Sequence, residues 1–120
     1  MSDPDELIDC ALTNDERHLL SQGLVQWNGP CYPTEAIAIA IGFDSLAAFS
    51  EQRNHIADAV DSGRALSARD WRRALVATEI AFASDVYGAG VEWPTVTGFA
   101  DDETVEILRA VQRKLVRIVP

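Results

Sequence analysis

The chain has 120 residues, 48% of them hydrophobic, and its formal net charge is −9 at pH 7. This length suits a single domain that can bury a core without disulfides or metals. The charge disfavours nucleic-acid binding, which needs a basic surface, and no apolar run approaches the roughly 20 residues of a membrane-spanning helix. The excess acid lies in the first half: residues 1–61 hold eleven acidic and two basic residues, whereas residues 62–120 hold eight of each.

The first residues, MSDPDELIDC, carry acids where a signal peptide carries bases. We therefore expect a cytoplasmic protein in which Cys10 and Cys31 are free thiols. Residues 1–11 are expected to form an acidic, frayed lead-in to a single helical domain that spans residues 1–120.

A first helix is predicted by the capping box Thr13-Asn14-Asp15-Glu16. It should end between Gly23 and Gln26, with an inward face made of Leu19, Leu20 and Leu24. The segment WNGPCYP, residues 27–33, follows with an Asn-Gly turn signal and two prolines, which prevent the helix from continuing.

Thr34 restarts the chain into EAIAIAIGF. The alternation of alanine and isoleucine there is compatible with a strand, but alanine favours a short helix, which Gly42 would end. A third helix is expected from a cap at Asp44 to Ala59 or Asp61, before a stop at Gly63. Its candidate core residues are Leu46, Phe49 and Ile56.

Ser67 is expected to begin a fourth helix that runs to about Tyr87, where Gly88 and Gly90 break it. Apolar or small residues cover almost its whole circumference, which is typical of a central helix. Glu79 falls between two apolar arcs of this helix, so it should be largely buried.

The fifth helix is predicted to start at a cap on Asp101 or Asp102 and to run nearly to Pro120. Gln112 lies within its apolar arc, so we expect a buried hydrogen-bonded pair between Gln112 and Glu79. Acids precede bases along this helix, an order that suits the helix dipole. Together the elements predict an all-α fold, a compact bundle of four long helices and one short helix.

The chain shows no catalytic or cofactor motif. The spacings of its cysteines and histidines (Cys10, His18, Cys31 and His55) match no short zinc-ligand pair, so we expect no metal site and no cofactor. A buried Glu79 could serve as a general acid or base, but we favour a polar tie that fixes helix register.

The run ALVATEIAFASDVYGAGVEWPTVTGFADDE, followed by LRAVQRKL, resembles a group of small acidic bacterial proteins of unassigned activity. The similarity extends from LTNDERHLLSQGLVQWNGP to the C-terminus. This group brings no catalytic motif, so it implies no functional residues. Small size, acidity, helical build and the lack of a catalytic signature are also features of immunity proteins, which block a cognate antibacterial toxin.

We therefore predict a protein-binding module rather than an enzyme, most concretely an immunity protein that occludes a basic toxin. Its surface should combine aromatic anchors with an acidic rim, and VYGAGVEWPTVTGF should be an ordered connection that carries recognition. The predicted partner-binding residues are Trp27, Tyr32, Asp58, Asp61, Glu92 and Trp93. The alternatives are a small enzyme or ligand-binding protein that uses Glu79, Asp85 and the Gly88–Gly98 loop, and a homodimer that buries an apolar helix face.

Overall fold

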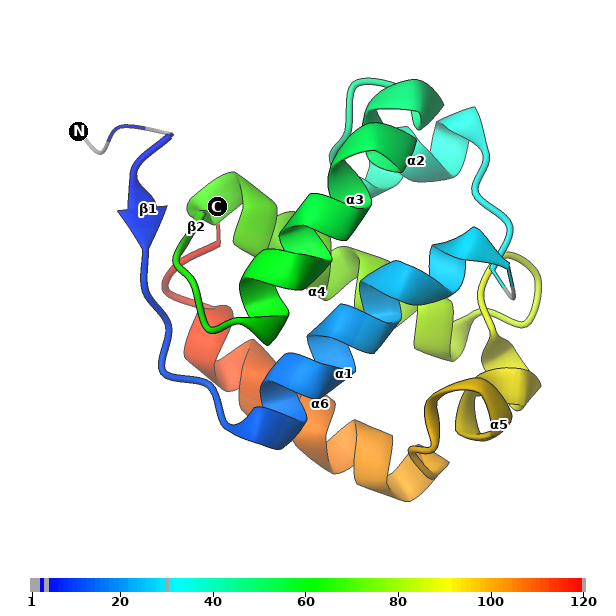
Figure 1. The fold of residues 1–120 in the computed structure, drawn as a ribbon. Coiled ribbons are helices and arrows are strands. Elements are labelled where there is room, and N and C mark those ends of the chain that lie inside the picture. The colour runs from blue at the N-terminus through cyan, green and yellow to red at the C-terminus, as the bar shows by residue number, and fades with distance from the viewer. Residues whose placement is uncertain (1–2, 4, 30, 120) are drawn as a thin grey trace.

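The computed structural model describes residues 3, 5–29 and 31–119 and confirms the predicted all-α class (Figure 1). The four long helices are α1 (Asn14–Val25), α3 (Leu46–Asp61), α4 (Ala68–Ala83) and α6 (Asp101–Leu115). The short elements are β1 (Leu7–Ile8), the 3-10 turn η1 (Gln26–Asn28), α2 (Glu35–Ile41), β2 (Leu66–Ser67), the 3-10 turn η2 (Gly90–Glu92) and α5 (Trp93–Thr97). The helix α5 is an addition to the predicted set.

The helices begin where side chains cap them. The predicted capping box is confirmed: Glu16 N donates to Thr13 Oγ1 at 3.1 Å, and Thr13 N donates to Glu16 Oε1 at 2.7 Å. Thr34 and Ser67, at which the second and fourth helices were expected to begin, cap α2 and α4 through their hydroxyls. The cap expected at Asp44 is instead Ser45, whose hydroxyl accepts from the N–H of Ala48 at 3.0 Å.

The start of α6 also differs from the prediction. Ala100 occupies the N-cap position without a side-chain hydrogen bond, so neither Asp101 nor Asp102 caps the helix. Both aspartates lie in its first turn, where their negative charge faces the positive end of the helix dipole. The helix ends at Leu115, before the predicted end near Pro120, a residue that lies outside the described part of the chain.

The helix α4 is central, as predicted, because it contacts α1, α2, α3, α6, β2 and η2. Its most buried side is the small-residue side, formed by Ala74, Ala77 and Ala81, which are fully buried. These residues let α1 approach closely, and α1 contributes the buried Leu19, Leu20 and Leu24. Figure 1 shows α1 crossing α4, with α3 on one side of α1 and α6 on the other.

Gly23 is required at the crossing of α1 and α4. A Cβ at Gly23 would lie 2.0 Å from Oγ1 of Thr78 and 2.6 Å from its Cα. Thr78 is itself fully buried, and its hydroxyl donates to Ala74 O at 2.8 Å. The two helix backbones therefore meet at a distance that only glycine allows.

Part of the segment that we expected to be a frayed lead-in is paired. The strands β1 and β2 are antiparallel, with Leu7 opposite Ser67 and Ile8 opposite Leu66. Trp71 on α4 adds a hydrogen bond from Nε1 to Ile8 O at 2.8 Å. This tie joins segments near the beginnings of the two halves of the chain. It has no signature in the sequence, because two-residue strands are too short for an alternating pattern.

None of the helices in the described ranges is both long enough and apolar enough to span a lipid bilayer.

Candidate recognition surface

Two of the predicted aromatic anchors, Trp27 and Trp93, lie in the core, which corrects the expectation that they face a partner. Trp27 is 2% exposed and Trp93 is 0% exposed. Each indole N–H is satisfied internally, by Ala77 O at 3.3 Å for Trp27 and by Thr104 Oγ1 at 2.9 Å for Trp93. Phe82 packs against Trp93 edge to face, with ring centroids 5.7 Å apart.

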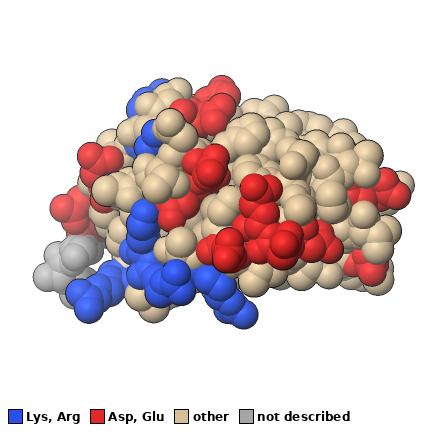
Figure 2. Space-filling view, turned by 90° about the horizontal axis from the view of Figure 1, so that it is seen from below, with Lys and Arg blue, Asp and Glu red and all other residues tan. Residues whose placement is uncertain are grey.

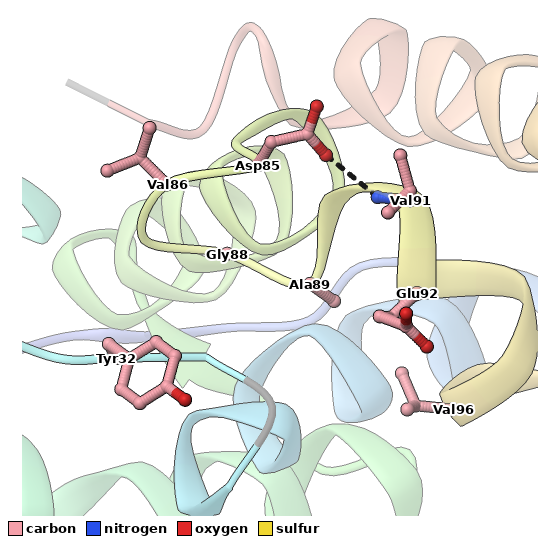
Figure 3. A pocket seen from close by; sticks show the side chains of 8 residues that line it. All are labelled: Tyr32, Asp85, Val86, Gly88, Ala89, Val91, Glu92 and Val96. Atoms are coloured by element: carbon pink, nitrogen blue, oxygen red, sulfur yellow. Dashed lines mark hydrogen bonds between the residues drawn. The ribbon is translucent and has the colours of Figure 1, made fainter.

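Tyr32 and Glu92, by contrast, come together at one surface hollow. The hollow has a volume of about 520 Å³. Figure 3 shows Tyr32 on one side of it and Glu92 with Val96 on the other, with the segment around Gly88 and Ala89 between them. We call this feature the Tyr32 hollow; its lining residues are Tyr32, Asp85, Val86, Gly88, Ala89, Val91, Glu92 and Val96.

The connection after α4 is held by its own side chains. The helix ends at Ala83, four residues before the predicted end at Tyr87, because the Ser84 hydroxyl accepts from the N–H groups of Val86 and Tyr87 at 3.2 and 3.0 Å. Asp85 Oδ1 then accepts from Val91 N at 2.8 Å (Figure 3). These bonds turn the chain back and give it a defined conformation.

Two glycines make this turn sterically accessible. A Cβ at Gly88 would lie 2.2 Å from Ile80 O, since the loop packs directly on the last turn of α4, where Ala89 N donates to Ala81 O at 2.7 Å. Gly90 has φ +48°, and a Cβ there would lie 1.9 Å from Asp85 Oδ1. The glycines therefore shape the loop and do not end α4 as predicted.

The Tyr32 segment is attached to the same loop. Tyr32 N donates to Tyr87 O at 2.7 Å, and the preceding Cys31 is buried and donates from its own N–H to Gln26 O at 3.0 Å. Burial raises the pKa of the Cys31 thiol to about 11, so the thiol is protonated at neutral pH and is not a nucleophile. Cys31 thus serves as an apolar anchor beneath Tyr32.

The surface around the hollow is apolar with acidic groups beside it. Tyr32 is 68% exposed, Val86 72% and Val91 78%, and Tyr87 is exposed as well. The carboxylates of Asp85 and Glu92 lie in the same lining, although that of Asp85 is engaged by Val91 N. Because large apolar side chains seldom gather at a surface without a partner, this arrangement is suited to binding another protein.

Asp58 and Asp61 lie elsewhere. Both are exposed in the last turn of α3, which contains no basic residue, and neither lines the Tyr32 hollow. Of the six predicted partner-binding residues, the two that line the Tyr32 hollow therefore lie together and the two tryptophans are buried. Asp58 and Asp61 form a separate acidic group. Their carboxylates can act on a partner at a distance through their charge.

The predicted pair between Glu79 and Gln112 is confirmed, with Gln112 Nε2 donating to Glu79 Oε2 at 2.7 Å. Arg109 extends it, because its Nη1 donates to Gln112 Oε1 at 3.1 Å. The expectation of deep burial is wrong, however, since Glu79 is only half-buried. It lines a shallow hollow of about 250 Å³ that stays open between α4 and α6.

Glu79 and Asp85, the two acids of the enzyme alternative, do not converge. Glu79 lines the hollow between α4 and α6, whereas Asp85 lines the Tyr32 hollow and a neighbouring one of about 290 Å³. Within residues 3, 5–29 and 31–119, no group of three or more His, Cys, Asp or Glu side chains is placed to hold a metal ion.

Comparison of the chain with protein-family models, with curated proteins and with solved structures finds no match.

Proposed function

We propose that this protein is a protein-binding module that uses the Tyr32 hollow to hold a basic partner. The observation that carries the proposal is the gathering of exposed Tyr32, Val86 and Val91 around a hollow that also contains Glu92. The loop that presents them is held by its own hydrogen bonds, so little conformational entropy is lost when it binds.

The most concrete form of this proposal is an immunity protein of a bacterial cytoplasm, which neutralises a basic toxin by covering its active site. The net charge of −9 supports it, because an acidic protein attracts a basic one. In this proposal Tyr32 and Glu92 contact the toxin directly, while Asp58 and Asp61 contribute to the attraction that brings the two proteins together.

The test begins with co-purification of the chain from its native host, followed by mass spectrometry. The same experiment is run with the double variant Tyr32→Ala/Glu92→Lys, whose positions are exposed, and with the control Glu51→Lys, which makes an identical charge change at an exposed position on α3. Glu92 makes no capping hydrogen bond to α5, so the variant should fold. We expect one basic partner with the wild type and with Glu51→Lys, and its loss with the double variant.

A second step tests neutralisation. The partner is expressed in a sensitive host alone, with the wild type, or with each variant. Protection by the wild type and by Glu51→Lys, but not by the double variant, supports the immunity role. A partner that is retained equally by all three proteins would show that the Tyr32 hollow is not the binding surface.

The alternative of a small enzyme or ligand-binding protein that uses Glu79, Asp85 and the Gly88–Gly98 loop has less support, because its two acids line different hollows and Asp85 is engaged by the loop itself. The neighbouring gene discriminates the two functions: a large secreted protein with a variable C-terminal domain favours immunity, whereas a metabolic operon favours the alternative.

A further inference from the structure

The outward face of α6 is divided into an acidic half and a basic half. At 100° per residue, one arc of about 120° lies opposite the buried residues of the helix, and the turn after Leu115 continues it. The exposed residues along this arc, in chain order, are Asp102, Val105, Glu106, Arg109, Arg113, Val116 and Arg117. Every acid on the arc therefore precedes every base.

The helix dipole accounts for the charges in the first and last turns, including Asp102 and Arg113, but not for Glu106 and Arg109, which lie between these turns. Residues four apart on this face also carry like charges, Asp102 with Glu106 and Arg109 with Arg113, an arrangement that destabilises an isolated helix. Among the described residues, the ion pairs formed involve none of the charged residues of this arc. The charged residues of this face therefore form no close ion pair within the described part of the chain.

Apolar side chains flank the charged face. Val116 is 66% exposed, and Val105 is exposed at the rim of the hollow between α4 and α6, next to Phe82 and Leu108. Figure 2, which views the molecule from the side where α6 lies in Figure 1, shows a row of Lys and Arg side chains at the lower left and a group of Asp and Glu side chains directly to its right.

We propose that α6 pairs antiparallel with α6 of a second copy of this chain, about a twofold axis close to Ala110. This register places Glu106 opposite Arg113 of the second copy and Asp102 opposite its Arg117. It also brings Val105 close to Val116 of the second copy. Because a twofold interface repeats every contact, each charge pair forms twice.

The order of charges along α6 favours a second copy of the chain as the partner, in an antiparallel orientation. A parallel pairing would place acid against acid, and a uniformly basic or acidic partner would leave one half of the face opposed by like charge. Residues 101–118 hold four acids and four bases, so this face has no net charge, while the excess acid lies in residues 1–61. The like-charge contact in this register is between the two copies of Arg109, which meet near the axis. Arg109, near the axis, is already hydrogen-bonded to Gln112, which holds the carboxylate of Glu79.

The pairing is independent of the proposed partner-binding surface, since no residue of α6 lines the Tyr32 hollow. A helix of this length spans about 22 Å, so the interface is small and the dimer should be weak. Its association should therefore be visible in the micromolar to millimolar range rather than at nanomolar concentration.

The experiment is sedimentation velocity on the full chain from roughly 10 μM to roughly 1 mM, a range that spans such affinities, at constant salt. We compare the wild type with Glu106→Arg and Arg113→Glu, measured separately and then mixed in equal amounts. Each variant alone converts both copies of one attractive pair into repulsion, so its dissociation constant should rise at least about tenfold. The control Glu51→Arg makes the same charge change on α3 and should dimerise like the wild type.

The mixture is the decisive measurement. In one contact of the heterodimer, the substituted residue 106 of one variant faces the substituted residue 113 of the other, with the two charges exchanged. In the second contact, the original Glu106 faces the original Arg113. Attraction is therefore restored in both pairs. We expect the mixture to regain a dissociation constant within about threefold of the wild type, which a mere folding defect could not produce. Any one of three results overturns the proposal: the wild type stays monomeric up to about 1 mM, the single variants dimerise like the wild type, or the mixture does not regain the affinity of the wild type.

Discussion

Trp27 and Trp93 each direct a buried indole N–H to an acceptor inside the fold. The two tryptophans in turn-rich segments were expected to anchor a partner, yet Trp27 and Trp93 both fill the core. Of the three predicted aromatic anchors, Tyr32 is the exposed one, and its neighbour Cys31 takes the buried position. The decisive feature is a nearby acceptor inside the fold, since Ala77 O and the Thr104 hydroxyl each accept from a buried indole N–H.

Replacement of Trp93 by alanine tests this placement. Trp93→Ala removes a fully buried ring and leaves the Thr104 hydroxyl without its donor. The free energy of unfolding, measured by urea denaturation, should fall by about 3–5 kcal/mol. An unchanged midpoint together with lost partner binding would instead show that Trp93 is an exposed anchor.

Glu16 links the start of α1 to the end of α6. Its side chain is buried, its Oε1 accepts from Lys114 Nζ at 2.5 Å, and the same oxygen accepts from Thr13 N. Burial alone raises the pKa of Glu16, but the hydrogen bonds from Lys114 and Thr13 outweigh it and hold the pKa below its ordinary value. The ionised form is therefore favoured in the folded protein.

This depressed pKa gives Glu16 a pH-dependent role in stability. A carboxyl with a lowered folded pKa stabilises the protein above its unfolded pKa of about 4.3, and the contribution is lost as pH falls through the folded value. Glu16→Gln should therefore lower the free energy of unfolding by about 1–3 kcal/mol at neutral pH, and the difference from the wild type should shrink in acid. Glu51→Gln, at an exposed position, serves as the control. If the difference in free energy of unfolding between Glu16→Gln and the wild type stays constant down to acid pH, the charge of Glu16 does not contribute to stability.

At the scale of elements, the helix starts lie within one or two residues of the predicted ones, although Ser45 and Ala100 take the N-cap positions expected at Asp44 and at Asp101 or Asp102. Thr13, Thr34 and Ser67 each cap a helix that was expected to begin there. These starts can be predicted because a hydroxyl that accepts from a backbone N–H three residues later makes a local interaction. The end of α4 was misplaced because apolar periodicity continues through Val86 and Tyr87, while Ser84 turns the chain away. A serine and an aspartate before two glycines are a turn signal that outweighs this periodicity.

That misplacement also hid part of the candidate site. Val86 was expected to lie inside a helix, whereas it is exposed at the Tyr32 hollow together with Val91. The meeting of this loop with Tyr32 depends on a backbone hydrogen bond between Tyr32 and Tyr87, which are far apart in the chain. Local sequence patterns carry no information about such a contact.

The crossing of α1 and α4 offers a test in which two effects oppose each other. In an exposed helix, Gly→Ala stabilises by about 1 kcal/mol because alanine is the better helix former. At Gly23, however, the added Cβ would overlap Thr78, including its backbone. We expect steric strain to outweigh propensity, so Gly23→Ala should lower the melting temperature, with a net loss of about 1–3 kcal/mol. A raised melting temperature would show that α1 and α4 can separate at little cost.

On the scale of the whole molecule, the positions of the acidic residues separate those proposed to contact the partner from those proposed only to attract it. Asp58 and Asp61 lie in the last turn of α3, away from the Tyr32 hollow, where the helix dipole disfavours negative charge. Their neutralisation in Asp58→Asn/Asp61→Asn should leave folding intact or stabilise it slightly. With a basic partner, it should slow association at low ionic strength and leave dissociation unchanged, because distant charges affect the encounter and not the bound complex.

Stopped-flow binding kinetics at several salt concentrations check this expectation. The screening length falls from about 30 Å at 0.01 M salt to about 3 Å at 1 M, so the wild type and the double variant should associate at converging rates as salt rises. A faster dissociation of the variant would show that Asp58 and Asp61 touch the partner, and the binding surface would then have to extend to the end of α3. Equal association rates at all salt concentrations would remove these two residues from the attraction altogether.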